Sequence, residues 1–160
     1  MSGYSIDEIF QFAIKMEEDG EKFYNRMAEK FKTNARVREV FQDLARQEVE
    51  HKNSFESMLK RFQSYSAPEN FPEEYFAYIR AFAENAVFNQ EKLNGEMQKI
   101  SDPISALEFA MGRELDAVNY YHELKNLVQD SDKEKIIYII EEEKRHYLYL
   151  NRVKREIQGS

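Results

Sequence analysis

The sequence predicts an all-α protein: an antiparallel four-helix bundle with a long helical crossover between the second and third bundle helices. Along four long segments, apolar residues recur at alternating steps of three and four, which is the period of one buried helix face. Only 5 glycines and 3 prolines interrupt the 160 residues, a composition poor in turns. The connector between the first two segments is short, so these segments are expected to be antiparallel neighbours. We expect one domain over residues 1–160, long enough to bury a core.

The first bundle helix is expected over residues 5–32. Ser5 followed by Glu8 is the pattern of a capping box at the start of a helix. One position of the apolar face carries a charged residue, Glu17, near the middle of the helix. Gly20 lies nearly one turn further on. Because glycine costs helix propensity, it suggests that another group approaches the helix closely at this point.

The second bundle helix is expected over residues 35–63. Its apolar face is interrupted by Glu48 and His51, which are three residues apart and therefore share one side of the helix. An unpaired carboxylate in a core costs several kcal/mol. We therefore expect another group to compensate the charge of Glu48.

The crossover is expected to follow a loop at residues 64–72, which contains two prolines. It is interpreted as one amphipathic helical segment over residues 73–99, with an interruption at Asn94-Gly95. No acidic residue occupies its apolar face. Its aromatic residues are therefore interpreted as packing against the flank of the bundle.

The third and fourth bundle helices lie in the second half of the chain. The third begins at Asp102-Pro103, where the aspartate caps the helix and the proline occupies its first position. Glu114 interrupts the apolar face of this helix. A polar turn at residues 129–132 leads to the fourth helix over residues 133–157, in which a glutamate and a histidine three residues apart interrupt the apolar face.

The two halves of the chain repeat one helical pair. The first and third helices share Phe-Ala, a glutamate four residues later, an aspartate two residues after it, and a tyrosine at the end. In the same way, Glu48-x-x-His51 of the second helix matches Glu143-x-x-His146 of the fourth. Each acidic position lies near the middle of its helix, so an antiparallel bundle would bring all four to one level.

Four buried carboxylates at one level cannot all remain ionised without cations. Two divalent ions would balance the four negative charges, and two neutral imidazoles would complete the ligands. Dinuclear sites in helical bundles use this set: one glutamate from each of two helices and Glu-x-x-His from each of the other two. Oxygen and nitrogen donors suit iron or manganese, with zinc as an alternative. The predicted metal ligands are Glu17, Glu48, His51, Glu114, Glu143 and His146.

Two of these carboxylates are expected to bridge two metal ions about 3.5–4 Å apart. Glu48 and Glu143 are the expected bridges. Glu17 and Glu114 would each bind one ion, with one histidine per ion. No catalytic residue is expected beyond this metal centre.

Four neighbouring residues are interpreted as supports of the ligands. Tyr24 and Tyr121 lie one helical repeat from the two non-bridging glutamates, and they either pack in the core or hydrogen-bond a ligand carboxylate. Gln47 and Glu142 each precede a bridging glutamate. They are candidates to orient the histidine of the partner helix.

Composition excludes several other classes of protein. The absence of cysteine excludes disulfides, zinc ribbons and cysteine-bound iron–sulfur centres within this chain. A net charge of -7 argues against nucleic acid as a partner. No apolar run approaches the roughly 20 residues of a membrane span, and the first residues lack the features of a signal peptide. We expect a cytoplasmic protein without a membrane or nucleic-acid partner.

These motifs resemble the ferritin-like di-iron carboxylate superfamily, and within it the rubrerythrin-like branch. The resemblance implies a non-haem di-iron centre that reduces hydrogen peroxide with electrons delivered by a rubredoxin domain. This chain departs from that pattern because it has no cysteine for a rubredoxin centre, and because Ala117 stands where rubrerythrins carry an additional glutamate. The six remaining ligands are similar to those of bacterioferritin and related oxidases. The motifs that carry the resemblance are Met16-Glu17-x-x-Gly20-x-x-Phe23-Tyr24, Gln47-Glu48-x-x-His51, Asp102-Pro103-x-x-Ala106-Leu107-x-x-Ala110 and Glu143-x-x-His146.

The resemblance implies a non-haem di-iron oxidoreductase that reduces dioxygen or hydrogen peroxide, in oxidative-stress defence or iron handling. Its cofactor would be two iron ions, and its reductant a separate electron donor. One alternative is a ferroxidase coupled to iron storage. Another is a non-catalytic bundle with a structural metal such as zinc. Related proteins are often dimers, so a homodimer is expected.

Overall fold

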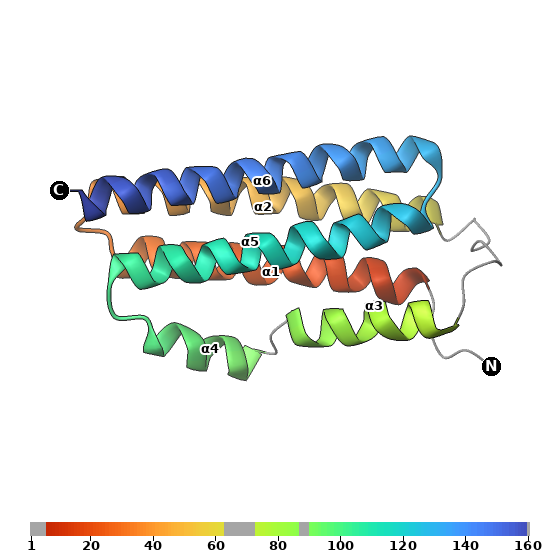
Figure 1. Ribbon diagram of the computed structural model, residues 1–160, viewed down its shortest axis with the longest axis horizontal. Helices are drawn as coiled ribbons and strands as arrows, with labels where there is room; N and C mark the ends of the chain where they lie inside the picture. Colours follow the sequence, from red (N-terminus) through yellow and green to blue (C-terminus); the bar gives the residue numbers. More distant parts are fainter. Residues whose placement is uncertain (1–5, 63–72, 87–89, 160) are drawn as a thin grey trace.

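Within the part of the chain that the structure describes, six α-helices account for most residues. The computed structural model describes residues 6–62, 73–86 and 90–159. Figure 1 shows four long helices running side by side, with two shorter helices along one flank. The helices are α1 (Ile6–Lys30), α2 (Ala35–Phe62), α3 (Glu73–Ala86), α4 (Gln90–Lys99), α5 (Pro103–Leu124) and α6 (Asp130–Gln158), with a 3₁₀ turn, η1 (Lys125–Leu127), between the last two.

The four long helices form two antiparallel pairs. The first pair is α1 with α2, and the second is α5 with α6 (Figure 1). The pairs are packed together through contacts of α1 with α5 and of α2 with α6. This arrangement confirms the predicted all-α bundle, in which the two copies of the sequence repeat face each other.

The ends of the bundle helices lie close to their predicted positions. The side chain of Asp102 caps α5, accepting a hydrogen bond from the backbone N–H of Ser105 at 2.9 Å, and Pro103 occupies the first position. α6 begins at Asp130, earlier than predicted, because two aspartates in its first turn favour the positive end of the helix dipole. The predicted cap at Ser5 lies outside the described residues.

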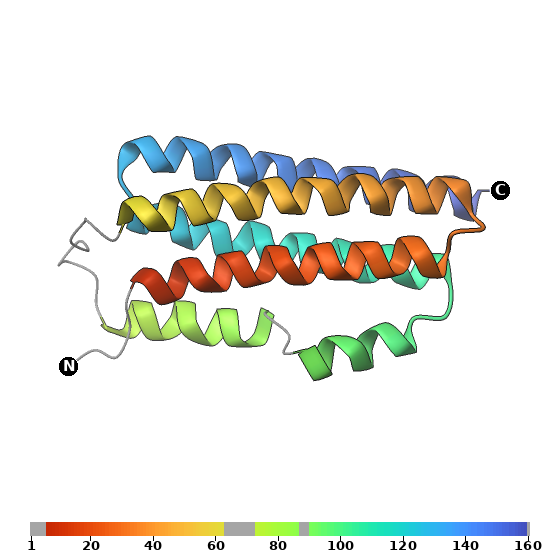
Figure 2. The ribbon, with the colours of Figure 1, turned by 180° about the vertical axis from the view of Figure 1, so that it is seen from behind.

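The crossover consists of two helices, and the predicted interruption at Asn94-Gly95 is wrong. α3 ends at Ala86 and α4 begins at Gln90, so Asn94 and Gly95 lie within α4. A glycine inside a helix costs only about 1 kcal/mol, and the surroundings of Gly95 are open, so no packing forces the helix to end there. Figure 2 shows α3 and α4 following each other along α1. The predicted loop at 64–72 falls outside the described residues.

The apolar core is divided into two clusters of buried side chains. One cluster includes Phe10, Phe55 and Ile139, and the other includes Phe41 and Leu150. Along each bundle helix, the buried glutamates and histidines lie between the residues of the two clusters. The bundle therefore has a polar layer at mid-height with apolar packing on both sides. None of the helices in the described ranges has the length and apolar character that crossing a membrane requires.

Candidate metal centre

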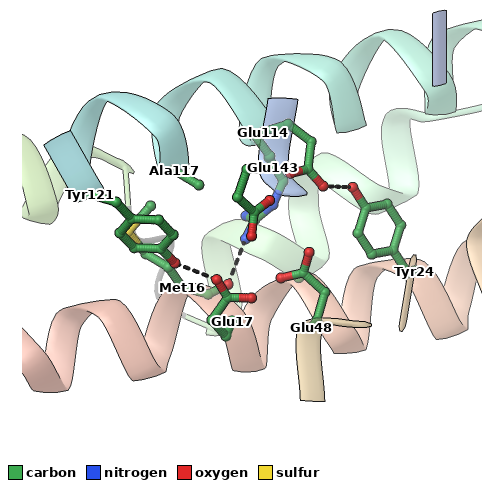
Figure 3. A pocket seen from close by; sticks show the side chains of 10 residues that line it. Met16, Glu17, Tyr24, Glu48, Glu114, Ala117, Tyr121 and Glu143 are labelled. Carbon is green, nitrogen blue, oxygen red and sulfur yellow. Dashed lines mark hydrogen bonds between the residues drawn. The ribbon is translucent and has the colours of Figure 1, made fainter. Parts of the chain in front are cut away.

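The six predicted ligands converge at the middle of the bundle. They come from all four long helices, and each is at most 5% exposed. The close-up in Figure 3 shows the four carboxylates turned toward one another from α1, α2, α5 and α6. The structure therefore brings together every residue that the sequence assigned to the centre.

The ligand atoms form two adjacent groups, in each of which all atoms lie within 4.8 Å of one another. Two carboxylates, Glu48 and Glu143, belong to both groups. The division is the one that two bridging glutamates require, although metal binding by these residues remains a prediction. The first group is Glu17, Glu48, His51 and Glu143, and the second is Glu48, Glu114, Glu143 and His146.

Both imidazoles direct the same ring nitrogen toward the carboxylates. His51 Nδ1 lies 2.7 Å from Glu143 Oε1 and 3.7 Å from Glu17 Oε2. His146 Nδ1 lies 3.4 Å from Glu143 Oε2 and 3.5 Å from Glu114 Oε2. The rings are stacked, with centroids 5.6 Å apart and an interplanar angle of 16°. Nδ1 is therefore the atom that each histidine offers to a cation.

The outer nitrogen of each imidazole is held by a residue of the opposite helical pair. His51 Nε2 is hydrogen-bonded to Glu142 Oε2, and His146 Nε2 to Gln47 Oε1 at 2.7 Å. Histidines that bind metals usually donate their second ring N–H in this way, which fixes the tautomer and the ring orientation. The two residues thus have the contacts that an orienting role requires.

The two tyrosines also act across the bundle. Tyr24 on α1 donates a hydrogen bond to Glu114 Oε1, and Tyr121 on α5 donates one to Glu17 Oε1 at 2.5 Å (Figure 3). Both alternatives of the sequence analysis apply, because the tyrosines are buried in the core and also bind a carboxylate. Each holds the glutamate of the other helical pair, which the spacing along one helix did not reveal.

Gly20 makes room for a ligand carboxylate. A Cβ at this position would lie 2.6 Å from Glu48 Oε2, closer than real Cβ contacts come, and 3.0 Å from Glu48 Cδ. The close approach predicted from the sequence is therefore that of Glu48. Ala117, the equivalent residue of the repeat, carries its methyl group in the same layer.

Burial and mutual repulsion make it unfavourable for all carboxylates of the cluster to be ionised without a cation. Burial and the neighbouring glutamates raise the pKa of Glu48 and Glu114 well above the ordinary value. Burial alone would lower the pKa of each histidine. The adjacent carboxylates raise it by more than burial lowers it, so the pKa is about 12 for His51 and about 10 for His146. Without another cation, the cluster thus retains protons to reduce its negative charge.

Several buried atoms in the cluster have no hydrogen-bond partner: Glu17 Oε2, Glu114 Oε2 and His146 Nδ1. Buried polar atoms are normally paired, and leaving one unpaired costs about 1–3 kcal/mol. All three atoms belong to residues of the two ligand groups. A donor set of carboxylates and imidazoles with unpaired atoms directed inward fits two divalent cations such as iron or manganese.

A small cavity adjoins the carboxylates. Its volume is about 20 Å³, which is close to the space that one water molecule occupies. Besides the four ligand glutamates, its lining includes Met16 and Ala117 (Figure 3). Arg113 also lines it. Arg113 was not predicted as part of the site, since charged residues next to a ligand usually face solvent. Here its guanidinium donates a hydrogen bond to the carbonyl of Met16 at 3.3 Å.

Asp19, two residues after Glu17, is a buried charged residue that the sequence analysis did not single out. It is fully buried and paired with Lys15 at 2.7 Å. The signal that could have found it was the aspartate shared by both copies of the repeat.

The fold and the site together define a class of protein, the helical bundles that hold a dinuclear metal centre between carboxylates and two Glu-x-x-His motifs. Comparison with known protein families identifies the family within this class. The family model described as Rubrerythrin matches residues 8–154, so the chain belongs to the rubrerythrin family of ferritin-like di-iron carboxylate proteins. No curated protein and no solved structure matched in the other two comparisons. The resemblance inferred from the motifs is therefore confirmed.

Proposed function

We propose that this protein is a di-iron oxidoreductase that reduces dioxygen or hydrogen peroxide with electrons from a separate donor. The observation that carries the proposal is the pair of adjacent ligand groups that share Glu48 and Glu143 beside a small cavity. Bound iron would supply the electrons that reduce the O–O bond. Membership of the rubrerythrin family supports iron as the metal.

The protein residues would hold the ions and control protons around them. Each ion would receive one terminal glutamate, one histidine Nδ1 and the two shared carboxylates. The hydroxyl groups of Tyr24 and Tyr121 fix the terminal glutamates. Burial, together with the nearby carboxylates, raises the pKa of both tyrosines well above 10, so they remain hydrogen-bond donors at neutral pH.

The size of the cavity supports a small oxidant. A volume of about 20 Å³, close to that of one water molecule, suits a small oxidant better than an organic substrate. An organic or protein reductant would therefore act from outside the cavity. Since the sequence contains no cysteine, this chain has no rubredoxin centre to deliver the electrons itself.

Anaerobic loading with ferrous iron tests the proposal. We expect two ions per chain, and an absorbance increase in the near-ultraviolet and visible range after mixing with dioxygen or hydrogen peroxide. The relative rates with the two oxidants would identify the preferred one. Stoichiometric zinc in the purified protein, with no absorbance change when the iron-loaded form meets either oxidant, would contradict the proposal. Light scattering would show a particle of dimer size rather than a storage shell.

A further inference from the structure

The two halves of the bundle place different acceptors behind their histidines. A carboxylate, Glu142, accepts from His51 Nε2, while a neutral amide, Gln47, accepts from His146 Nε2. The two acceptors occupy equivalent places in the sequence repeat, each directly before a shared glutamate. The repeat is thus preserved in geometry but differs in charge at this position.

A carboxylate attracts the Nε2 proton more strongly than an amide oxygen does. The imidazole ring then carries more negative charge, and its Nδ1 becomes a stronger electron-pair donor to a metal cation. The side chain of Glu142 is only 16% exposed, so solvent screens its charge incompletely. Both effects favour a cation next to His51 over one next to His146.

The remaining ligands are of the same kinds in the two metal-binding groups. Each group has one terminal glutamate, one histidine and the same two shared glutamates. Each terminal glutamate also receives one tyrosine hydroxyl. The acceptor behind the histidine is therefore a principal difference between the groups.

We propose that Glu142 is a positioning residue that makes the two metal positions inequivalent. The position formed by Glu17 and His51 binds a divalent cation first and more tightly. The position formed by Glu114 and His146 fills second and releases its ion more readily. This inference rests on the two-metal site of the proposed function and assigns an order of filling to it.

The test exchanges the acceptors between the two halves. Full-length apo protein is titrated anaerobically with Mn²⁺ by calorimetry as wild type, Glu142→Gln, Gln47→Glu and the double exchange. Wild type should bind two ions in two distinct steps. Glu142→Gln keeps a hydrogen-bond acceptor but removes the charge, so the tighter step should weaken about tenfold and approach the second. Gln47→Glu should strengthen the weaker step by a similar factor.

The double exchange should restore two distinct steps in the opposite order. Crystals with one equivalent of Mn²⁺ would locate the first ion by anomalous scattering: next to His51 in wild type and next to His146 in the double exchange. Matching circular dichroism spectra of the apo forms control for folding.

Three results would overturn the inference: equal affinities in wild type, an unchanged first step in Glu142→Gln, or a first ion that stays beside His51 in the double exchange. Failure of the proposed function is distinguishable. It appears as fewer than two ions at saturation, or as two ions with no reaction toward either oxidant.

Discussion

The α1–α2 pair and the α5–α6 pair carry the same set of candidate metal ligands and the same tyrosine, yet neither pair could form the site alone. Tyr24 of the first pair holds Glu114 of the second, and Tyr121 of the second holds Glu17 of the first. The acceptors of the outer imidazole nitrogens also cross between the pairs. Duplication of a helical pair therefore yields a complete site only when two pairs pack face to face.

The two pairs differ where a ligand approaches a helix backbone. In the first pair, Glu48 lies so close to Gly20 that a Cβ would overlap its carboxylate. In the second pair, Ala117 occupies the equivalent place and lines the small cavity beside the carboxylates. The repeat therefore preserves the ligands but not the space around them.

Removing a shared carboxylate should have the largest effect, because it damages both halves at once. Glu143→Ala takes a donor from each ligand group, so we expect the protein to lose both ions after dialysis, as measured by elemental analysis. Glu50→Ala, an exposed glutamate on α2, is the matched control and should retain them. Retention of two ions per chain by Glu143→Ala would show that the assigned ligands are wrong.

The difference between Gly20 and Ala117 predicts that the two halves respond differently to a change of one methyl group at this position. Gly20→Ala forces the Glu48 carboxylate to move, so we expect weaker metal binding, on the order of tenfold, and an overpacking cost of about 1–3 kcal/mol. The reciprocal variant, Ala117→Gly, should cost only about 1 kcal/mol of helix propensity and leave affinity nearly unchanged. Metal titration measures the change in affinity, and urea denaturation measures the change in the free energy of unfolding. Equal effects of the two variants would remove this distinction between the halves.

The crossed tyrosine bonds should contribute equally to the two halves. Tyr24→Phe leaves Glu114 Oε1 without its donor, and Tyr121→Phe does the same to Glu17 Oε1. We expect each variant to lower the free energy of unfolding by about 1–3 kcal/mol, measured by urea denaturation of the apo protein. Tyr78→Phe, at an exposed position on α3, provides a control. A much larger loss in one tyrosine variant would indicate that one half dominates the core.

The charged residues that the two halves bring together predict that the stability of the metal-free protein depends on pH. Because folding raises the pKa of His51 to about 12 and that of His146 to about 10, their stabilising protonation is complete below pH 6.5 and is lost as pH rises through those values. The raised pKa of Glu48 also destabilises the folded state as pH increases above 4.5. The lowered pKa of Glu143 contributes stability above 4.5 and does not alter the trend.

We therefore expect the unfolding temperature of the apo protein to fall by several degrees between pH 6.5 and 9, as followed by circular dichroism. Metal ions compete with these protons, so the stabilisation gained on loading should increase over the same range. An apo protein that becomes more stable across this range would contradict the charge distribution of the cluster.

Most of the site was predictable because a charged residue within a regular apolar stripe is a local signal. Glu17, Glu114 and the two Glu-x-x-His motifs each interrupt such a stripe, and the repeat relates them to one another. The break in the crossover was not predictable in the same way. Asn94-Gly95 is a strong local signal for a turn, but both residues lie within α4, because a glycine inside a helix costs only about 1 kcal/mol.

The sequence by itself determined the fold class and the chemical identity of the ligands, because helical period and the cost of buried charge depend only on residue type and spacing. Tertiary structure decided which atoms meet. It turned both Nδ1 atoms inward, crossed the tyrosines to the opposite glutamates and placed Glu48 against Gly20. The tyrosine contacts depend on the offset and rotation of one helical pair against the other, and the contact of Glu48 with Gly20 depends on how α2 packs against α1. The packing of the two apolar clusters sets both.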